Sequence, residues 1–276
     1  IAMPNCPQAI YAFYALNCIG AIGNMVHPLS AEKELEFYIN ESNSITVITL
    51  DQFYGKFSSI RENTKVRNII LASIKDELPV AIRAGYQLTE GRKIPKVPKD
   101  AQVIWWKDFL KPGRIWKEDP AVHMEADDTA VILYSGGTTG TTKGVELTNL
   151  NFNANGAHIV GVNQMFRPGD RMMSALPIFH GFGLGVCIHS MLLNGGSCIL
   201  MPRFTADSYS KLLLKKKCNF LAGVPTLYEA MTRSNVLEKA DLSFLKGVFS
   251  GGDCVTGPKK AKVLVFPMEP NDKKII

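Results

Sequence analysis

Short apolar runs alternate with amphipathic segments along the first part of the chain. Pro7 can open a helix, because the first helical position needs no N–H, and we expect this helix to end near Gly20. Ser30 is the predicted N-cap of a second helix, with Glu32 and Glu34 in its first turn. Two runs rich in β-branched residues predict strands at 45–50 and 66–72.

The second half of the chain repeats this alternation. Strands are predicted at 130–134, 144–147, 171–175, 197–201 and 219–222. Helices are predicted after Thr148 towards residue 162, over 182–193, and after the N-cap Thr205, with Lys215–Lys217 as a solvated C-terminal end. Strands that alternate with helices indicate an α/β fold of layered, largely parallel sheets covered by helices. Residues 197–222 form a predicted β-α-β unit with a right-handed crossover.

Residues 79–128 differ in composition, because prolines are interleaved there with lysines and arginines. We expect a long surface connection here, with one short helix near Trp105–Leu110. Trp105, Trp106 and Trp116 are predicted to be packing anchors.

The 276 residues are 46% hydrophobic and 20% charged, which excludes a disordered tail and a membrane bundle. A net charge of +6 suits an anionic small ligand or a weak membrane contact and argues poorly for nucleic acid. The chain has six cysteines: Cys6, Cys18, Cys187, Cys198, Cys218 and Cys254. They lack the spacing of a zinc site, and we expect them to be reduced, buried thiols of a cytosolic protein.

One segment carries most of the chemical information, the stretch from Tyr134 to Gly144. Its glycines let the backbone approach a bulky anion, its hydroxyls can donate to phosphate oxygens, and Lys143 adds a positive charge. The spacing is not that of a Walker A loop, because Lys143 is followed by glycine. A flexible polar hairpin is the alternative interpretation. The predicted phosphate-binding residues are Ser135, Gly136, Gly137, Thr138, Thr139, Gly140, Thr141, Thr142, Lys143 and Gly144.

This loop resembles the phosphate-binding signature of the adenylate-forming superfamily, which includes acyl-CoA synthetases, luciferases and peptide-synthetase adenylation domains. Gly136 stands where the family pattern has serine, and Thr142 where it has proline. Further segments resemble the family in the expected order: 3–7, 176–183, 224–226 and 245–252. The histidine in 176–183 favours the fatty-acyl-CoA synthetase-like branch, and the resemblance covers roughly residues 1–258.

The resemblance implies roles for several further residues. Ser250, Gly251 and Gly252 would abut the adenine, and His180 would lie beside the substrate carboxylate with Gly181 and Phe182. A histidine bonded to backbone at a helix start is the alternative for His180. The glycines at 181, 183 and 185 fit an acyl channel or simple close packing equally well. His189 is expected to be a satisfied core residue.

The implied fold is part of the large N-terminal domain of these enzymes. We expect a first subdomain with its connection at 1–125, a second subdomain with the phosphate loop at 126–258, and an unmatched tail at 259–276. The family's Y-G-x-T-E segment and its C-terminal domain are not found in the chain. We therefore expect a truncated product that is inactive alone, with exposed apolar faces.

The implied reaction is ATP-dependent activation of a fatty or other apolar acid, first to acyl-AMP and then to acyl-CoA. ATP, Mg²⁺ and CoA are the implied cofactors, although the main residues for Mg²⁺ and CoA are missing from the chain. Two alternatives stay open. One is a non-catalytic nucleotide-binding or scaffolding fragment. The other is an unrelated phosphotransferase that uses the Gly/Thr loop, with Asp127 and Asp128 as the nearby candidates for a metal-binding pair. We expect a cytoplasmic protein with a possible peripheral membrane contact.

Overall fold

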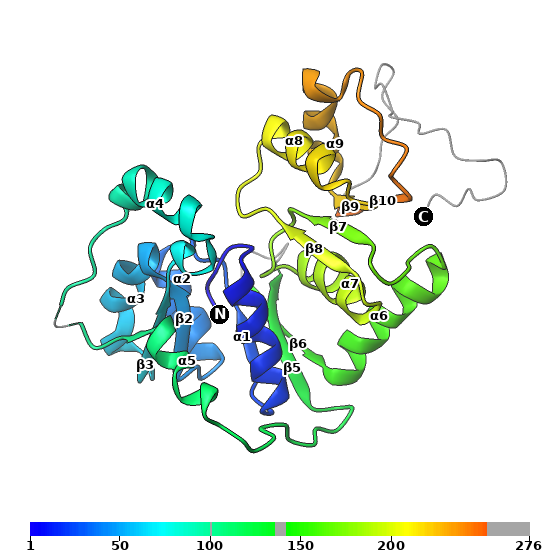
Figure 1. Ribbon diagram of the computed structural model, residues 1–276. Coiled ribbons are helices and arrows are strands. Elements are labelled where there is room, and N and C mark those ends of the chain that lie inside the picture. The colour runs from blue at the N-terminus through cyan, green and yellow to red at the C-terminus, as the bar shows by residue number, and fades with distance from the viewer. Residues whose placement is uncertain (100, 136–141, 253–276) are drawn as a thin grey trace. The chain divides into compact units, whose positions relative to one another are not determined.

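The computed structural model describes residues 1–99, 101–135 and 142–252 (Figure 1). The chain divides into two compact units, Ile1–Leu150 and Asn151–Ile276. This division comes later than the predicted boundary between residues 125 and 126. The strand Thr129–Ser135 pairs with Gly23–Met25 near the start of the chain, and Lys143–Thr148 pairs in turn with Thr129–Ser135.

The first unit contains two small sheets. In one, β2 (Thr46–Leu50), β3 (Asn68–Ala72) and β4 (Ile104–Trp105) run parallel. In the other, β1 (Gly23–Met25) pairs parallel with β5 (Thr129–Ser135), which pairs antiparallel with β6 (Lys143–Thr148). The helices are α1 (Pro7–Cys18), α2 (Glu32–Glu41), α3 (Tyr54–Ile60), α4 (Val80–Leu88) and α5 (Trp106–Leu110). Short 3₁₀ turns are η1 (Asp51–Phe53), η2 (Arg61–Asn63), η3 (Ile74–Glu77), η4 (Glu90–Lys93) and η5 (Pro112–Arg114).

The first two helices begin close to their predicted starts. Pro7 is the first residue of α1, as expected from its missing N–H. The N-cap of α2 is Ala31 and not Ser30. Here the Glu34 side chain accepts a hydrogen bond from the Ala31 backbone N at 3.2 Å, so a carboxylate replaces the predicted hydroxyl at this helix start.

The segment 79–128 contains more helix than its composition indicates. α5 lies at the predicted place, but α4 was not predicted, and it buries none of its residues. Only one of the three tryptophans is a packing anchor, since Trp106 is 3% exposed whereas Trp105 and Trp116 are 39% and 62% exposed. The prediction for the other two was wrong.

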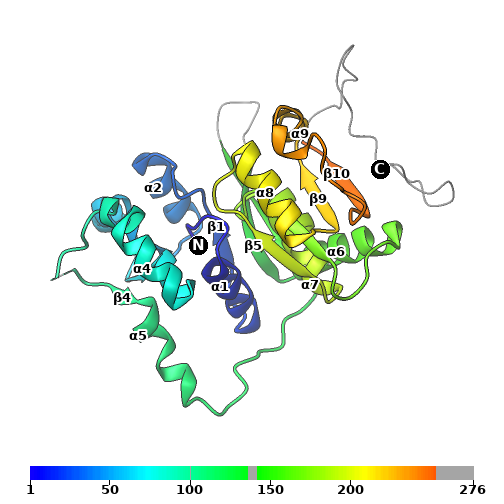
Figure 2. The ribbon, with the colours of Figure 1, turned by 45° about the horizontal axis from the view of Figure 1, so that its top comes forward.

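The second unit is built on one parallel sheet of order β10-β9-β7-β8 (Figures 1 and 2). The strands are β7 (Arg171–Ser174), β8 (Ser197–Leu200), β9 (Phe220–Gly223) and β10 (Gly247–Ser250). The helices are α6 (Asn149–Asn163, which begins in the first unit), η6 (Phe182–His189), α7 (Ser190–Leu193), α8 (Ala206–Lys216), α9 (Pro225–Thr232) and the 3₁₀ turn η7 (Asn235–Leu237). The predicted β-α-β unit is present, with β7 lying between its two strands.

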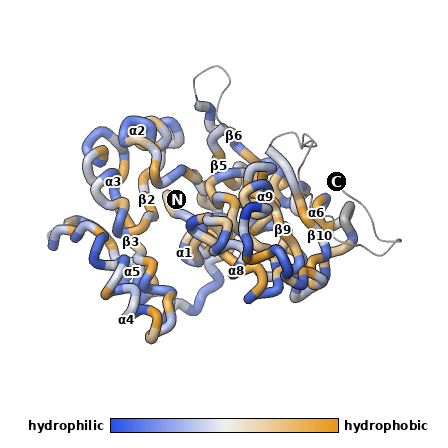
Figure 3. The backbone as a smooth tube through the Cα atoms, turned by 90° about the horizontal axis from the view of Figure 1, so that it is seen from above, coloured by the Kyte–Doolittle hydropathy of each residue, from blue (hydrophilic) through white to orange (hydrophobic). Residues whose placement is uncertain are grey.

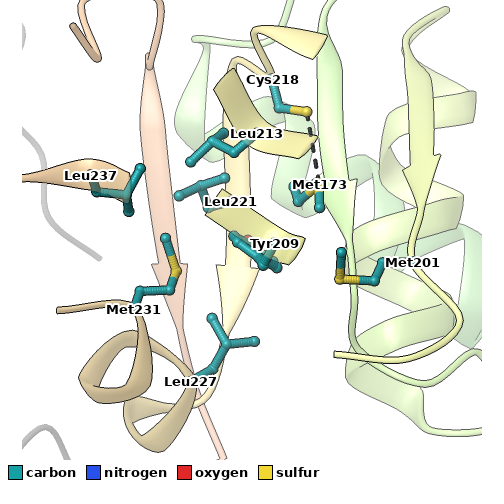
Figure 4. Close-up of a cluster of buried hydrophobic side chains, with 9 residues drawn as sticks. All are labelled: Met173, Met201, Tyr209, Leu213, Cys218, Leu221, Leu227, Met231 and Leu237. Carbon is teal, nitrogen blue, oxygen red and sulfur yellow. Dashed lines mark hydrogen bonds between the residues drawn. The ribbon is translucent and has the colours of Figure 1, made fainter. Parts of the chain in front are cut away.

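Side chains of β7 alternate between the two faces of this sheet. Met173 packs with Tyr209 and Leu213 of α8 in a buried cluster that also holds Leu221 of β9 (Figure 4). Its neighbour Ser174 points the other way and donates to a carbonyl of η6. Residues Met172–Ser174 of the strand are therefore buried on both sides.

The start of α8 is as predicted. The Thr205 hydroxyl accepts a hydrogen bond from the Ser208 backbone N at 3.2 Å, which satisfies one of the free N–H groups of the first turn. Lys215–Lys217 are exposed at the other end of the helix, in agreement with a solvated helix end.

The predicted helix over 182–193 is a π-helix, η6, followed by one turn of α-helix, α7. One carbonyl near the end of η6 is bonded from outside the helix. The carbonyl of Cys187 accepts hydrogen bonds from the Ser174 hydroxyl at 3.2 Å and from the Cys198 thiol at 3.3 Å, so it is satisfied from outside the helix.

The described cysteines are free, as expected, and most of them are protected. Cys6, Cys187 and Cys218 are buried and Cys198 is half-buried, but Cys18 is exposed, against the prediction of burial. Cys18 closes the last turn of α1, on the helix end that faces water. Cys254 and the tail 259–276 lie outside the described residues.

Candidate functional site

In the first unit, the strands β5 and β6 hold both ends of the predicted phosphate loop. They form an antiparallel pair in which Ser135 is opposite Lys143 and Tyr134 is opposite Gly144. Ser135 and Lys143 are exposed. Six predicted residues lie outside the described part of the chain: Gly136, Gly137, Thr138, Thr139, Gly140 and Thr141. The loop therefore starts and ends at two facing backbone positions.

Tyr134 anchors this hairpin to the rest of its unit. Its hydroxyl donates a hydrogen bond to the backbone O of Tyr38 at 3.1 Å, and the two rings lie 4.1 Å apart between centroids. Burial raises the pKa of Tyr134 to about 12, so the hydroxyl stays a donor at neutral pH.

Gly144 makes room for the Tyr134 ring. A Cβ at this position would lie 3.2 Å from Ile132 Cγ2 and 3.3 Å from Tyr134 Cε1. A side chain here would push the ring away from Tyr38. This glycine therefore fits a packing role beside the predicted phosphate contact.

In the second unit, the carboxyl ends of β7, β9 and β10 meet at one edge of the parallel sheet, which is where ligands bind in open α/β sheets. The predicted adenine turn lies at this edge. The Gly251 N–H donates to the carbonyl of Gly223 at 3.2 Å, and Gly252 has a φ of +85°, a conformation that favours glycine. Ser250 is the last residue of β10.

Tyr228 of α9 fixes the end of β10, and the sequence analysis did not identify it. Its hydroxyl donates to the carbonyl of Phe249, one residue before the turn. Burial raises the pKa of Tyr228 well above its usual range, which keeps this donor protonated. The only sequence signal was an aromatic residue three positions after Pro225, which helix packing alone would also explain.

The same edge brings the predicted adenine turn and the predicted acyl segment together. A Cβ on Gly251 would lie 3.2 Å from Cε1 of the Phe182 ring. Phe182 is half-buried and Gly181 is exposed. These two stretches are separated by about seventy residues in sequence, so their contact supports one site built from both.

His180 is exposed at the start of η6. Its Nδ1 accepts a hydrogen bond from the Phe182 N–H at 3.2 Å, and its own backbone N–H donates to Pro177 O at 3.1 Å. This is the backbone-bonded arrangement foreseen as the alternative. Because Nδ1 is an acceptor, the neutral ring carries its proton on Nε2, which leaves Nε2–H to donate to a ligand.

The glycines of η6 are explained by close packing at one position. A Cβ on Gly183 would lie 2.0 Å from the carbonyl O of Pro177, so only glycine fits there. At Gly185 the nearest atom would be Asn155 Oδ1 at 3.3 Å. His189, further along η6, is 6% exposed and stacks on Phe152 with 4.2 Å between ring centroids. Burial lowers the pKa of His189, in agreement with a core histidine.

The acidic residues named for a phosphotransferase have local contacts. The Asp128 carboxylate accepts a hydrogen bond from the Glu125 N–H at 2.7 Å. Across 1–99, 101–135 and 142–252, no group of three or more His, Cys, Asp or Glu side chains could hold a metal ion. We assign no step of the reaction to Mg²⁺.

Comparison with known proteins gives a consistent result. A family model described as "AMP-binding enzyme" matches residues 1–262. The chain is 30% identical to the long-chain-fatty-acid–CoA ligase of Bacillus subtilis over 269 residues, which are 95% of this chain and 47% of that protein. It is 27% identical to 4-coumarate–CoA ligase 1 of Solanum tuberosum, over 99% of this chain and 50% of that protein. The chain thus spans about half the length of these relatives.

Solved structures agree on the fold. A long-chain-fatty-acid-CoA ligase from Archaeoglobus fulgidus superposes with a TM-score of 0.69 at 24% identity, over 93% of this chain and 46% of that one. An anthranilate CoA ligase in complex with anthranoyl-AMP superposes with a TM-score of 0.75 at 20% identity, over 91% of this chain and 44% of that one. The expected α/β fold, part of the N-terminal domain of these enzymes, is confirmed.

Proposed function

The chain belongs to the family of AMP-binding enzymes, and we propose that the full-length protein activates a carboxylic acid with ATP and passes it to CoA. A carboxylate oxygen attacks the α-phosphorus of ATP, and pyrophosphate leaves. The CoA sulfur then attacks the acyl carbon, its proton is lost, and AMP leaves as the thioester forms. Relatives named for fatty acids and for 4-coumarate both act on acids with a large apolar part. We propose such an acid here, with a fatty acid as the first choice.

The observation that carries this proposal is the pairing of Ser135 with Lys143 across the mouth of the loop. The pairing puts Lys143, which ends the loop in sequence, opposite Ser135, which starts it. In the proposed reaction Lys143 neutralises charge on the β- and γ-phosphates, where negative charge grows as pyrophosphate leaves. Ser135 and the residues up to Gly144 donate to the same phosphates.

The edge of the second unit supplies the remaining contacts in this proposal. The turn Ser250–Gly252 receives the adenine, and the adjoining Gly181 and Phe182 receive the acyl group. His180 donates its Nε2 proton to an acyl oxygen and so orients the carboxylate. This role is compatible with the bond to its Nδ1, because the two ring nitrogens act separately.

Substitution of Lys143 in the full-length protein tests the proposal. We expect Lys143→Ala to lower the rate of pyrophosphate exchange into ATP about 100-fold or more, as for the loss of one strong electrostatic contact to a transition state. Lys143→Arg should retain part of the rate. Lys215→Ala, at an exposed lysine of α8, is the matched control and should leave the rate unchanged. Equal ATP affinity and exchange rate in Lys143→Ala would contradict the proposal.

Residues 1–276 alone should give no measurable pyrophosphate exchange, because they span about half of the relatives' length. Exchange at an ordinary rate by this chain would show that the part of the relatives beyond the matched region is not needed. Transfer of the γ-phosphate to an acceptor would instead support the phosphotransferase alternative, and ATP binding without turnover would support a binding fragment.

We further propose that the protein works in the cytoplasm. None of the helices in the described part of the chain could cross a bilayer.

A further inference from the structure

Helix α4 in the first unit turns its apolar side to solvent. Val80, Ile82 and Leu88 are 79%, 57% and 62% exposed, while the only half-buried residues of the helix are Arg83 and Tyr86. Figure 3 shows hydrophobic and polar positions mixed along this helix. A surface helix of a soluble unit normally does the reverse, with its apolar stripe against the core. Such a face indicates a partner that accepts apolar side chains.

A cleft lies beside the inner side of the same helix. Its volume is about 430 Å³, and Lys75, Lys96, Lys99, Tyr86 and Trp105 are among the residues that line it. No ion pair within the described residues involves any of these three lysines. Asp51 also lines the cleft, but it is buried, and its carboxylate accepts a hydrogen bond from the Gln52 N–H at 2.9 Å. The Asp51 carboxylate faces Lys75 electrostatically, whereas Lys96 and Lys99 form no ion pair among the described residues, so the cleft offers positive charge next to aromatic side chains.

The sequence around the cleft has the same sign of charge. Residues 75–99 contain six basic and three acidic side chains, which gives a net charge of +3. An apolar helix face flanked by cationic side chains is the arrangement by which peripheral proteins lie on an anionic membrane: the apolar residues enter the acyl boundary and the lysines meet lipid phosphates.

We propose that α4 and the lysine cleft together form a docking surface for an anionic lipid bilayer. Val80 and Leu88, which lie on one side of α4, insert at the interface, and Lys75, Lys96 and Lys99 bind phosphate groups of the lipids. The surface gives a location to the peripheral membrane contact named in the sequence analysis, and it is separate from Lys215–Lys217. It does not depend on the ligase reaction, because none of its residues belongs to the proposed site.

Vesicle binding by the full-length protein tests this surface. The probes are vesicles of phosphatidylcholine alone and of phosphatidylcholine mixed with phosphatidylglycerol, and the measurement is co-sedimentation. We expect binding to the mixed vesicles only. Lys96→Gln with Lys99→Gln should weaken it about 25-fold, since each lysine near an anionic surface contributes about fivefold. Val80→Ser with Leu88→Ser should weaken it tenfold or more.

Matched controls use residues of equal exposure elsewhere. Ile115 is 82% exposed in the first unit, so Ile115→Ser should leave binding unchanged. Lys215→Gln with Lys216→Gln removes two exposed lysines of α8 and should also have no effect. Pyrophosphate exchange without vesicles should be unaffected by the α4 and cleft variants, which separates a failure of this proposal from a failure of the proposed function.

Four results would overturn the proposal. Binding that is equally tight on neutral vesicles contradicts the role of the lysines, and equal losses in the controls contradict the location. If Val80→Ser with Leu88→Ser changes the mass of the protein in light scattering but not vesicle binding, a second copy covers α4. If the same variant lowers the melting temperature of the full-length protein without lipid, another part of the chain covers it.

Discussion

At the scale of single residues, Gly183 of η6 occupies a position with no room for a side chain. Its Cα lies so near the carbonyl of Pro177 that an added methyl group would overlap it. We expect Gly183→Ala to lower the free energy of unfolding by about 1–3 kcal/mol, as for an overpacked site. Chemical denaturation measures the effect.

Gly161 of α6 provides the control for this substitution. A Cβ at Gly161 would meet nothing within 4 Å, so Gly161→Ala should stabilise the protein by about 0.5–1 kcal/mol through helix propensity. A Gly183→Ala variant as stable as the natural protein would show that the segment 177–183 adjusts freely, and an acyl channel would then regain support.

The buried His189 gives the protein a pH dependence. Burial lowers its pKa in the folded state, so the unfolded state binds a proton first as the pH falls below about 6.5. The free energy of unfolding should therefore decrease with falling pH from about 6.5 down to the folded pKa, by up to about 1.4 kcal/mol per pH unit. Above pH 7 this group should contribute no slope.

Urea denaturation of His189→Gln at several pH values measures this slope. The variant should lose that part of the decrease, while His158→Gln, at an exposed histidine of α6, should keep it. An unchanged slope in His189→Gln would assign the pH dependence to other groups.

At the scale of elements, sequence patterns located strands and capped helices well. β9 and α8 were predicted because an apolar run and a threonine cap are local signals. α4 was missed because its apolar residues face solvent, against the usual relation between pattern and burial. The π-helical form of η6 was also missed, and its Cys187 carbonyl is bonded by Ser174 and Cys198 from two neighbouring strands.

The candidate site shows the same division between local and long-range information. The loop stems and the Ser250–Gly252 turn were found from short motifs. The contact between Gly251 and Phe182, and the hydrogen bond from Tyr228 to Phe249, join segments distant in sequence and needed the folded chain. No local pattern distinguishes a tyrosine that fixes a strand end from one that fills a core.

The cap of α8 makes a prediction at this scale. Thr205→Ala removes the hydroxyl that accepts from the Ser208 N–H, and we expect a loss of about 0.5–2 kcal/mol in the free energy of unfolding. Thr205→Ser should restore most of it. Thermal and chemical unfolding of the three proteins checks this order, and an alanine variant as stable as the serine variant would contradict the cap.

At the scale of the whole molecule, thiol reactivity reports on burial. Burial raises the pKa of Cys6 and Cys218 to about 11 and of Cys187 and Cys198 to about 12, whereas Cys18 is exposed. Because thiolates are the reactive form, Cys18 should be alkylated first at pH 8 in the native protein, with the other four protected until denaturant is added.

Peptide mapping by mass spectrometry identifies the alkylated positions among these five. Cys18→Ser should remove the early label without changing the unfolding midpoint. Early labelling of Cys187 or Cys218 would mean that the sheet of the second unit opens readily in the native state.

The hairpin of β5 and β6, which carries the proposed phosphate loop, should transmit the effect of nucleotide binding to the rest of its sheet. Ser135 and Lys143 are opposite each other in the antiparallel pair of β5 and β6. On its other side β5 pairs parallel with β1, where Val131 is opposite Gly23. If the loop binds ATP as proposed, the bound nucleotide would restrain β5 and β6 directly and β1 through its pairing with β5. Amide protons of β5 and β6, far from any ligand atom, should exchange with deuterium more slowly when ATP is bound. The exchange rates of these amides would then report whether ATP is bound, without a label or substitution in the loop.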